Sequence, residues 1–564
     1  MASSRMLNLF SKNNVSVFKR VKRSNSTGPP IVVDGPERLT SWGGSPLSIG
    51  TIRSWNGYIY DQHRFYATDK CDTAVIKGLV VGMYKKESDK DLKLTSSGEK
   101  FDDRAQGKIS ELLRESGYTG ALGKGKLFSN LDPEFRSVAV VGLGQEGAGY
   151  NELEMIDEGM ENARVAAGVG ARALQLQGCT DVFVDSMEYP EQAAEGSALA
   201  VWRYNSNKRK QNRTAIPKLE LYDSPDVDAW TRGLFKAESQ NLARRLTDAP
   251  GNQMTPTIFA QSTVDALCPC GVTVEIRSMD WIEQNHLNSF LMVAKGSCEP
   301  PVVLEVSYCG AAPEDRPILL LGKGITYNSG GLCLRRKQCL HLYRGCMAGA
   351  AVCVATIRAA AALSLPLNIS AVLPLCENMP SGMSVKPGDV VTLLNNKTLG
   401  IVDIDKAGVV VMADPLLYAQ ATFKPRLVVD IATLGDGVCS GLGGGAAGIF
   451  SNSNYIYKQF EKAGGLTGDR VWRLPLWNYY KDLITPNSNF DISNRGRGPA
   501  SSCIAAAVLH ELVPCVDWAH LDIRNVGLLT QFNPLPYLLK DRMTGRPTRT
   551  IIQFLYQMAC PDSK

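Results

Sequence analysis

The chain has 564 residues, of which 44% are hydrophobic and 21% are charged. These fractions are close to those of an average globular protein, so they exclude collagen, coiled coil and wholesale disorder, and no stretch approaches the 18 apolar residues of a membrane-spanning helix. Lys and Arg number 61 against 56 Asp and Glu, but six of the basic residues lie within 1–33, a segment without acidic residues. The rest of the chain is near neutral and lacks the broad basic surface of a nucleic-acid-binding protein.

Residues 1–33 have the composition of a targeting segment. They are basic and rich in Ser and Asn, and a helix here would place five apolar side chains near one face: Met6, Leu7, Phe10, Val15 and Phe18. A basic, acid-free, amphipathic segment is typical of a mitochondrial presequence, and we predict one over 1–33. The alternative is a disordered basic tail. The predicted location is mitochondrial, in the matrix or in a mitochondria-derived structure, with the cytoplasm as the alternative.

The next part of the chain alternates short apolar runs with helical patterns. Strands are predicted over 74–84, 137–142 and 181–185, and Ala-rich helices over 153–176 and 193–204. Alternation of this kind is typical of βαβ units with a parallel sheet. We therefore predict an N-terminal α/β domain over 45–210.

A second α/β series follows a polar, basic stretch at 205–216 and a helix at 226–247, which we assign to a linker helix over 211–249. Strands are predicted over 317–323, 367–375 and 426–433, and helices over 346–363 and 406–421. The predicted C-terminal domain covers 250–564, so the fold class is α/β with a smaller and a larger domain.

Three familiar motifs are incomplete. Gly142-Leu-Gly144-Gln-Glu-Gly147 lacks the acid about 20 residues on that a dinucleotide site needs, so we interpret it as a turn. His510-Glu511 begins an HExxH-like sequence, but Pro514 stands at its last position, and no role is assigned to any His. The chain has fifteen Cys, and no secretory signal precedes them, so we expect reduced thiols. We interpret Cys268-Pro-Cys270 as a loop.

Polar residues gather where the predicted strands of the second series end. Lys323 and a Gly-rich turn follow one strand, 378–389 follows another, 403–409 opens a helix, and 430–434 ends a third strand. The carboxyl ends of strands are where α/β sheets place their sites. These segments are therefore expected to converge on one cleft.

These segments resemble the leucyl aminopeptidase family, the two-metal cytosol aminopeptidases. The resemblance rests on GKGITYNSGG (322–331), NMPSG (378–382), KPGDVV (386–391), VDIDKAGVVVMADPL (402–416), DIATL (430–434) and WAHLDI (518–523). It runs in consistent order over about 70–560. It implies a small N-terminal macro-like α/β domain, a larger C-terminal α/β aminopeptidase domain with a central mixed, largely parallel sheet, a hexamer of two stacked trimers, and two divalent metals, Zn or Mn.

The resemblance also assigns the site residues, and there the chain departs from the family pattern. Lys323 and Asp405 match two of the family's metal ligands. The other positions are changed: Asn328 and Cys346 stand where the family has Asp, Ala407 where it has Glu, Arg335 where it has a catalytic Lys, and Val409 where it has an Arg that positions a bicarbonate base.

These changes remove the negative charge that two metal ions need. The family ligands supply three Asp and one Glu, whereas this chain keeps Asp405 and, as a thiolate, Cys346. Two unit charges 4 Å apart repel by about 4 kcal/mol at an effective dielectric of 20, and two dications by about four times that. We therefore expect no bound metal, and a Lys323–Asp405 ion pair in its place. A single Zn²⁺ held by Lys323, Asn328, Cys346 and Asp405 remains the alternative.

Three hypotheses for function follow. The first is a catalytically inactive family member acting as a structural hexameric component, similar to the divergent sperm leucyl aminopeptidases of insects, with a possible higher-order lattice. The second is an active or weakly active metal-dependent aminopeptidase that removes N-terminal residues from peptides. The third is a regulatory subunit in a hetero-hexamer with active paralogues. None of the three requires nucleic acid or a membrane span.

Overall fold

The computed structural model describes residues 75–85, 92–485, 489–513, 516–528 and 535–560. The described residues all belong to one unit, Ala74–Lys564. The predicted presequence at 1–33 and the first part of the predicted N-terminal domain lie outside the described residues.

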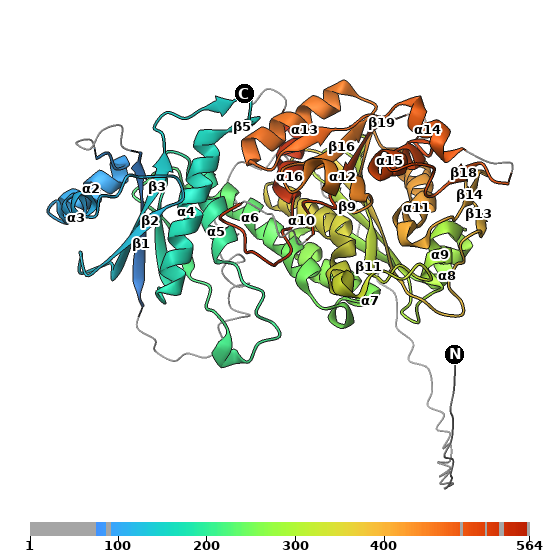
Figure 1. Cartoon of the computed structure of the whole chain (residues 1–564), viewed down its shortest axis with the longest axis horizontal. Helices are drawn as coiled ribbons and strands as arrows, with labels where there is room; N and C mark the ends of the chain where they lie inside the picture. The colour runs from blue at the N-terminus through green and yellow to red at the C-terminus, as the bar shows by residue number, and fades with distance from the viewer. Residues whose placement is uncertain (1–74, 86–91, 486–488, 514–515, 529–534, 561–564) are drawn as a thin grey trace, which may run out of the picture. The chain divides into compact units, whose positions relative to one another are not determined.

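The N-terminal sheet has the order β2-β3-β1-β6-β7. Four strands are parallel and β2 runs antiparallel at one edge: β1 (Lys77–Tyr84), β2 (Gly125–Ser129), β3 (Ser137–Gly144), β6 (Asp181–Asp185) and β7 (Lys218–Tyr222). Figure 1 shows helices on both faces, α4 (Glu158–Leu176) and α5 (Pro190–Val201) on one and α2 (Ser96–Arg104) and α3 (Lys108–Glu115) on the other. The central strands are apolar throughout because both faces are covered.

Several details differ from the sequence-based expectation. The helix expected over 193–204 spans Pro190–Val201, and β2, α2 and α3 lie where no element was predicted. The helix expected from 153 begins only at Glu158, because the preceding residues form the hairpin β4 (Tyr150–Asn151) and β5 (Ile156–Asp157). The Asp157 carboxylate then caps α4 by accepting a hydrogen bond from the Met160 N–H. Strand β7 lies beyond residue 210, so the sheet draws on the segment that the sequence assigned to the linker.

The C-terminal sheet is mixed and largely parallel, with the order β17-β16-β19-β15-β10-β12-β9-β8 and with β11 beside β12. Its strands are β8 (Thr273–Arg277), β9 (Val302–Cys309), β10 (Ile318–Gly322), β11 (Gly324–Asn328), β12 (Asn368–Asn378), β15 (Leu427–Ala432), β16 (Ala447–Ser451), β17 (Val471–Arg473) and β19 (Asp517–Asp522). The central strands β12, β10, β15 and β19 are mutually parallel. A small sheet, β13 (Val390–Thr392), β14 (Thr398–Gly400) and β18 (Ile492–Ser493), lies apart from it.

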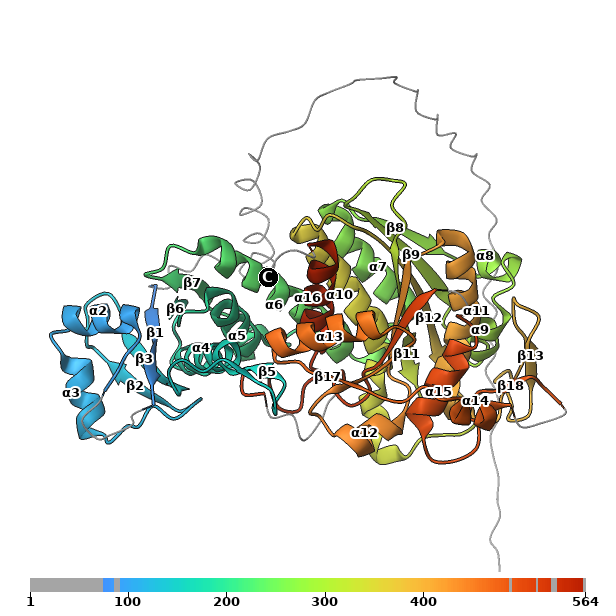
Figure 2. The same cartoon turned by 90° about the horizontal axis from the view of Figure 1, so that it is seen from above.

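Helices cover both faces of this sheet (Figure 2). Alternate residues of β10 face two separate apolar cores, Ile318 and Leu320 one core and Leu319 and Leu321 the other. The first core contains α6 (Val227–Asp248), α7 (Pro256–Leu267), α10 (Ala348–Ala362), α13 (Asn454–Thr467) and α16 (Thr548–Ala559). The second contains α8 (Met279–Gln284), α9 (Asn288–Ala294), α11 (Ala407–Phe423), α14 (Asn478–Ile484) and α15 (Ser501–His510).

One helical stretch, Lys337–Ala362, is long and apolar enough to cross a membrane by length and composition alone. Its apolar window is 89% buried inside the protein, as expected of a core helix, and it contributes to the first core through α10. The cysteines of the described residues before Cys560 carry free thiols. Cys268–Cys270 forms a single 3₁₀ turn between α7 and β8.

Candidate functional site

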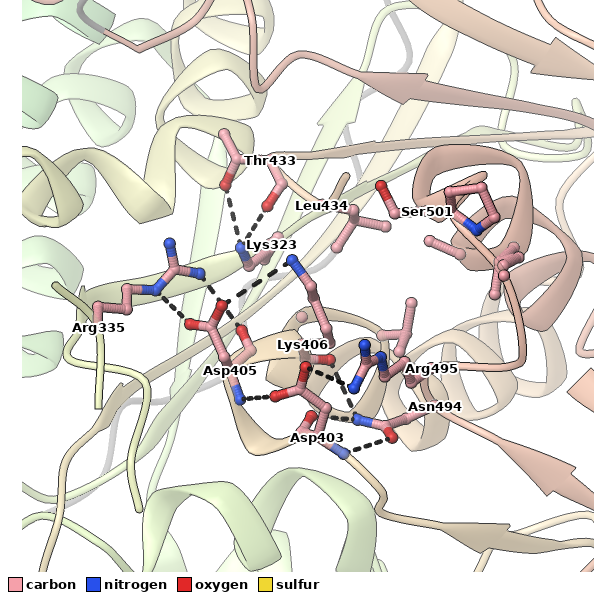
Figure 3. Close-up of a pocket in the computed structure, with 16 residues that line it drawn as sticks. Lys323, Arg335, Asp403, Asp405, Lys406, Thr433, Leu434, Asn494, Arg495 and Ser501 are labelled. Atoms are coloured by element: carbon pink, nitrogen blue, oxygen red, sulfur yellow. Dashed lines mark hydrogen bonds and ion pairs between the residues drawn. The ribbon is translucent and has the colours of Figure 1, made fainter. Parts of the chain in front are cut away.

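The predicted site residues meet at the carboxyl ends of the central strands of the C-terminal sheet. Lys323 follows β10, Asn328 ends β11 and Thr433 follows β15, while Asp405 lies in the 3₁₀ turn η6 (Ile404–Lys406) that leads into α11. A cavity of about 190 Å³ opens here (Figure 3), and both Lys323 and Asp405 line it. No histidine of the described chain lines this cavity.

Lys323 points into the end of the sheet and is almost fully buried. Its Nζ donates to the Thr433 carbonyl oxygen at 2.7 Å and to the Thr433 hydroxyl at 3.0 Å, and it lies 3.0 Å from Cys346 Sγ. Burial lowers the pKa of Lys323 below its usual value, and Cys346 only partly offsets this effect. The lysine predicted as a metal ligand therefore already has three partners within the protein.

Cys346 lies at the end of the 3₁₀ segment η5 (Lys337–Met347), just before α10, and is buried. Burial alone would raise the pKa of this thiol, but the positive charges of Lys323 and Arg335 outweigh burial and hold the pKa below its ordinary value. Lys323 and Cys346 therefore contact each other within the buried part of the site.

The side-chain oxygen of Asn328 is the atom that could bind a metal, and it is engaged by two donors. It accepts from the Gly330 N–H at 2.9 Å and from Asn378 Nδ2 at 2.8 Å. The amide nitrogen of Asn328 points toward Cys346 Sγ at 3.5 Å. Asn328 therefore acts as a hydrogen-bonding link between β11, β12 and Cys346.

The expected Lys323–Asp405 ion pair is wrong. Asp405 instead forms an ion pair with Nε of Arg335, and its other carboxylate oxygen lies 3.9 Å from Lys406 Nζ. The Arg335 guanidinium also stacks 3.6 Å from the ring centroid of Tyr343. Lys323 does not take part because Thr433 and Cys346 hold its ammonium, whereas the longer Arg335 side chain reaches Asp405.

The last two substituted positions lie in the first turn of α11. Ala407 and Val409 are buried and carry no group that could ligate a metal or hold an anion. Between them, Gly408 packs against the site lysine, since a Cβ added at Gly408 would lie 2.9 Å from Lys323 Cε. This turn therefore encloses the aliphatic part of Lys323.

Known proteins resemble this chain over most of its length. The sequence profile of the "Cytosol aminopeptidase family, catalytic domain" matches residues 241–552, and that of the family's N-terminal domain matches 80–211. The chain is 42% identical to the cytosol aminopeptidase of Xenopus tropicalis over 91% of its own length and 99% of the relative's. The human cytosol aminopeptidase is also 42% identical, over 88% and 95%. The chain belongs to the cytosol aminopeptidase family.

A solved structure has a similar fold to the present chain. The bottromycin maturation enzyme BotP in complex with Mn superposes with a TM-score of 0.74 and 27% identity, covering 86% of this chain and 100% of that enzyme. The architecture of a smaller N-terminal and a larger catalytic α/β domain, with a mixed and largely parallel sheet, is thus the one that the resemblance implied.

The donor set does not fit the two divalent metals that the family implies. Among the described residues, no three His, Cys, Asp or Glu side chains lie close enough together to hold a metal ion. The one retained carboxylate, Asp405, is bound to Arg335, and the sulfur of Cys346 lies against Lys323. A dication placed between these pairs would face two cationic side chains, and only Asp405 and a Cys346 thiolate would offset its charge. The same argument applies to a single Zn²⁺.

Sequence reasoning missed a set of charged neighbours around Arg335. Asp436 lies 3.1 Å from Lys406 Nζ and 2.5 Å from Arg524 Nε. Burial would raise the pKa of Asp436, but Arg524 and Lys406 outweigh burial and lower that pKa to about 2. Arg524 also donates to the Tyr343 hydroxyl at 2.9 Å. The sequence offers one indication of this set: Asp436 and Arg524 follow the carboxyl ends of β15 and β19, where α/β sheets place their functional sites.

Proposed function

We propose that this chain is a catalytically inactive member of the cytosol aminopeptidase family in which side-chain cations take the place of the metal ions. The ion pair between Asp405 and Arg335 is the observation that carries the proposal. It engages the single retained carboxylate ligand and brings a guanidinium, which does not lose its proton, into the centre of the site.

The neighbouring residues support this proposal. Ala407 offers no ligand atom, and the Asn328 oxygen is engaged by two hydrogen-bond donors. Val409 is apolar and cannot hold an anionic base at the position where the family pattern has an Arg. The Arg335 guanidinium could still bind an oxyanion, but no group in this set is arranged to activate water.

A second candidate is an active or weakly active metal-dependent aminopeptidase. The comparisons alone favour it, since relatives that are 42% identical over nearly their whole length are named cytosol aminopeptidases. Such an activity would need a ligand arrangement different from the one described above.

Hydrolysis of leucine-p-nitroanilide by the full chain, with added Mn²⁺ or Zn²⁺, separates the two candidates. We expect no turnover above buffer and, by elemental analysis, far less than one metal ion per subunit. Turnover that Asp405→Ala abolishes and Asp403→Asn retains would overturn the proposal, since Asp403 is the neighbouring carboxylate outside the ligand set.

A restored variant gives the positive control. Asn328→Asp, Cys346→Asp and Ala407→Glu together return three anionic ligands, and Arg335→Lys removes the guanidinium that engages Asp405. We expect this fourfold variant to bind close to two Mn²⁺ per subunit. Metal uptake by the unchanged chain equal to that of the variant would contradict the charge argument.

We further propose a structural role, in which the chain forms a homo-hexamer, or a hetero-hexamer with paralogues, inside a mitochondria-derived structure such as that of insect sperm. Family membership supports assembly, and the basic, acid-free segment 1–33 supports import. Native mass measurement tests the assembly, with a monomer as the contrary result. Import of a reporter fused to 1–33 tests the location. Co-purification with a subunit that retains all the family ligands would favour the regulatory role instead.

A further inference from the structure

The cavity at the candidate site carries an uncompensated positive charge. Lys323 Nζ is engaged by Thr433 and Cys346 and is left out of the balance. The remaining charged residues of the lining are three cations and two carboxylates: Arg335, Lys406, Arg495, Asp403 and Asp405. Just outside the lining, Asp436 contacts both Lys406 and Arg524, which adds one charge of each sign. The lining therefore has one positive charge in excess, and a monoanion would neutralise it.

Hydrogen-bond donors at the cavity are also left over. Within the described part of the chain, Arg495 has one charged partner, Asp403, at 3.9 Å, which is beyond hydrogen-bonding distance. Its planar guanidinium can thus still bind a carboxylate through two N–H groups. The Ser501 hydroxyl accepts from the Gly437 N–H at 2.9 Å, so its own proton remains available. Figure 3 shows Arg495 and Ser501 around the same cavity.

Part of the lining is apolar, beside the polar residues Thr433 and Asn494. Val409, Leu434, Ile504 and Ala505 contribute aliphatic groups, and they are largely buried. Val409 stands where the family pattern has Arg, so this apolar wall is a feature of the present chain. The volume, about 190 Å³, is below the roughly 300–1,000 Å³ of sites for drug-sized ligands. The ligand is therefore small, with a charged end and an aliphatic end.

We propose that this cavity binds a small carboxylate with a branched aliphatic tail, through Arg495 and Lys406 at the charged end and the Val409–Ile504 wall at the other. A free organic acid and the carboxyl end of a peptide share this chemistry. The inference does not require the chain to hydrolyse peptides. The cavity should not bind an amine, because the excess positive charge of the lining repels a cationic ligand.

Isothermal titration of the full chain with isovalerate and with isoamylamine tests the sign of the charge, because both compounds carry a branched five-carbon skeleton. We expect saturable binding of isovalerate and none of the amine at equal concentration and ionic strength. N-acetyl-Gly-Leu and its C-terminal amide form the second arm. Tighter binding of this acid than of isovalerate identifies a peptide carboxyl end, and weaker binding identifies a free acid.

Arg495→Gln and Arg497→Gln are a matched pair, because both residues are exposed and only Arg495 lines the cavity. We expect Arg495→Gln to weaken isovalerate binding about tenfold, the effect of losing one charge-assisted hydrogen bond, and Arg497→Gln to leave it unchanged. Equal binding of the amine, equal effects of the two variants, or isovalerate binding that appears only with Mn²⁺ would each overturn the inference.

Discussion

At the scale of single residues, the site is organised by one carboxylate and the cations that contact it. Asp405 forms its ion pair with Arg335, whose side chain is only 9% exposed. The same guanidinium stacks on Tyr343, which Arg524 contacts from another direction. Without the carboxylate, the charge of Arg335 would stay largely buried and lose its ion-pair partner, and such uncompensated charges are costly.

Asp405→Asn is therefore expected to destabilise the protein. The loss in free energy of unfolding should be about 2 kcal/mol, the range for removing one partner of a largely buried charged pair. Urea unfolding at neutral pH measures it. In an enzyme with two bound metals, the same change would remove a metal ligand. In the metal-free form of such an enzyme it would also reduce the repulsion among the carboxylate ligands, which would stabilise that form.

A double-mutant cycle separates these cases. With Arg335→Met already present, the guanidinium is gone and Asp405→Asn should cost less than about 0.5 kcal/mol. An equal cost in both backgrounds would show that the ion pair is not what Asp405 contributes.

The sequence could identify the changed residues of the site but not their partners. Asn328, Cys346 and Ala407 stand out because motif positions are fixed along the chain, and strand ends place them together. Which cation pairs with Asp405 depends on how far each side chain reaches. Thr433 holds Lys323, and no motif marks that contact. Arg524 and Asp436 were missed because their partners are distant in the sequence.

At the scale of elements, the central strands β10, β12 and β15 were predicted within a few residues, but the buried strands β9 and β16 were not predicted, and α4 starts five residues later than expected. Strand β10 reads as a continuous apolar run because both faces are covered, and its observed bounds fall within the expected range. The start of α4 depends on the β4–β5 hairpin and on the Asp157 cap, which compete with a helical pattern in 153–157. Local competition of this kind is not visible in apolar periodicity alone.

The first turn of α11 offers a test of element packing. Gly408→Ala should destabilise the protein by about 1–3 kcal/mol, although Ala is the better helix former, because the new Cβ would lie 2.4 Å from Leu434 Cδ2 and 2.9 Å from Lys323 Cε. Gly441 lies in α12 (Asp436–Leu442) with no atom within 4 Å of an added Cβ, so Gly441→Ala should be neutral or stabilising. Chemical unfolding compares them, and equal effects would contradict the packing argument.

At the scale of the whole molecule, a buried ionic cluster joins the helices of the N-terminal sheet to those of the C-terminal sheet. Glu195 of α5 lies 2.6 Å from Arg164 Nε of α4 and 2.6 Å from Arg549 Nη1 of α16. Arg549 also donates to the Thr467 carbonyl oxygen of α13. All three charged side chains are almost fully buried, so the junction depends on Glu195 remaining ionised.

The pH dependence of this junction has a definite sign. Burial would raise the pKa of Glu195, but Arg164, Arg549 and Lys236 outweigh burial and lower that pKa from 4.5 to about 2. A pKa lowered by folding stabilises the protein above the unfolded value, near 4.5, and this stabilisation is lost as the pH falls toward 2. The shift corresponds to about 3 kcal/mol at neutral pH.

Glu195→Gln should therefore lower the free energy of unfolding by about 3 kcal/mol at pH 7, because it removes the anion that the buried Arg164 and Arg549 share. The difference from the unchanged chain should shrink as the pH falls from 4.5 to 3, where Glu195 of the unfolded chain is protonated. Urea unfolding over pH 3–7 measures it. Glu154→Gln is the control, since Glu154 pairs with Arg470 at 2.8 Å but is half-exposed, and it should cost less than about 0.5 kcal/mol at every pH. A Glu195→Gln difference that stays constant over this range would mean that the cluster is held by packing rather than by the charge of Glu195.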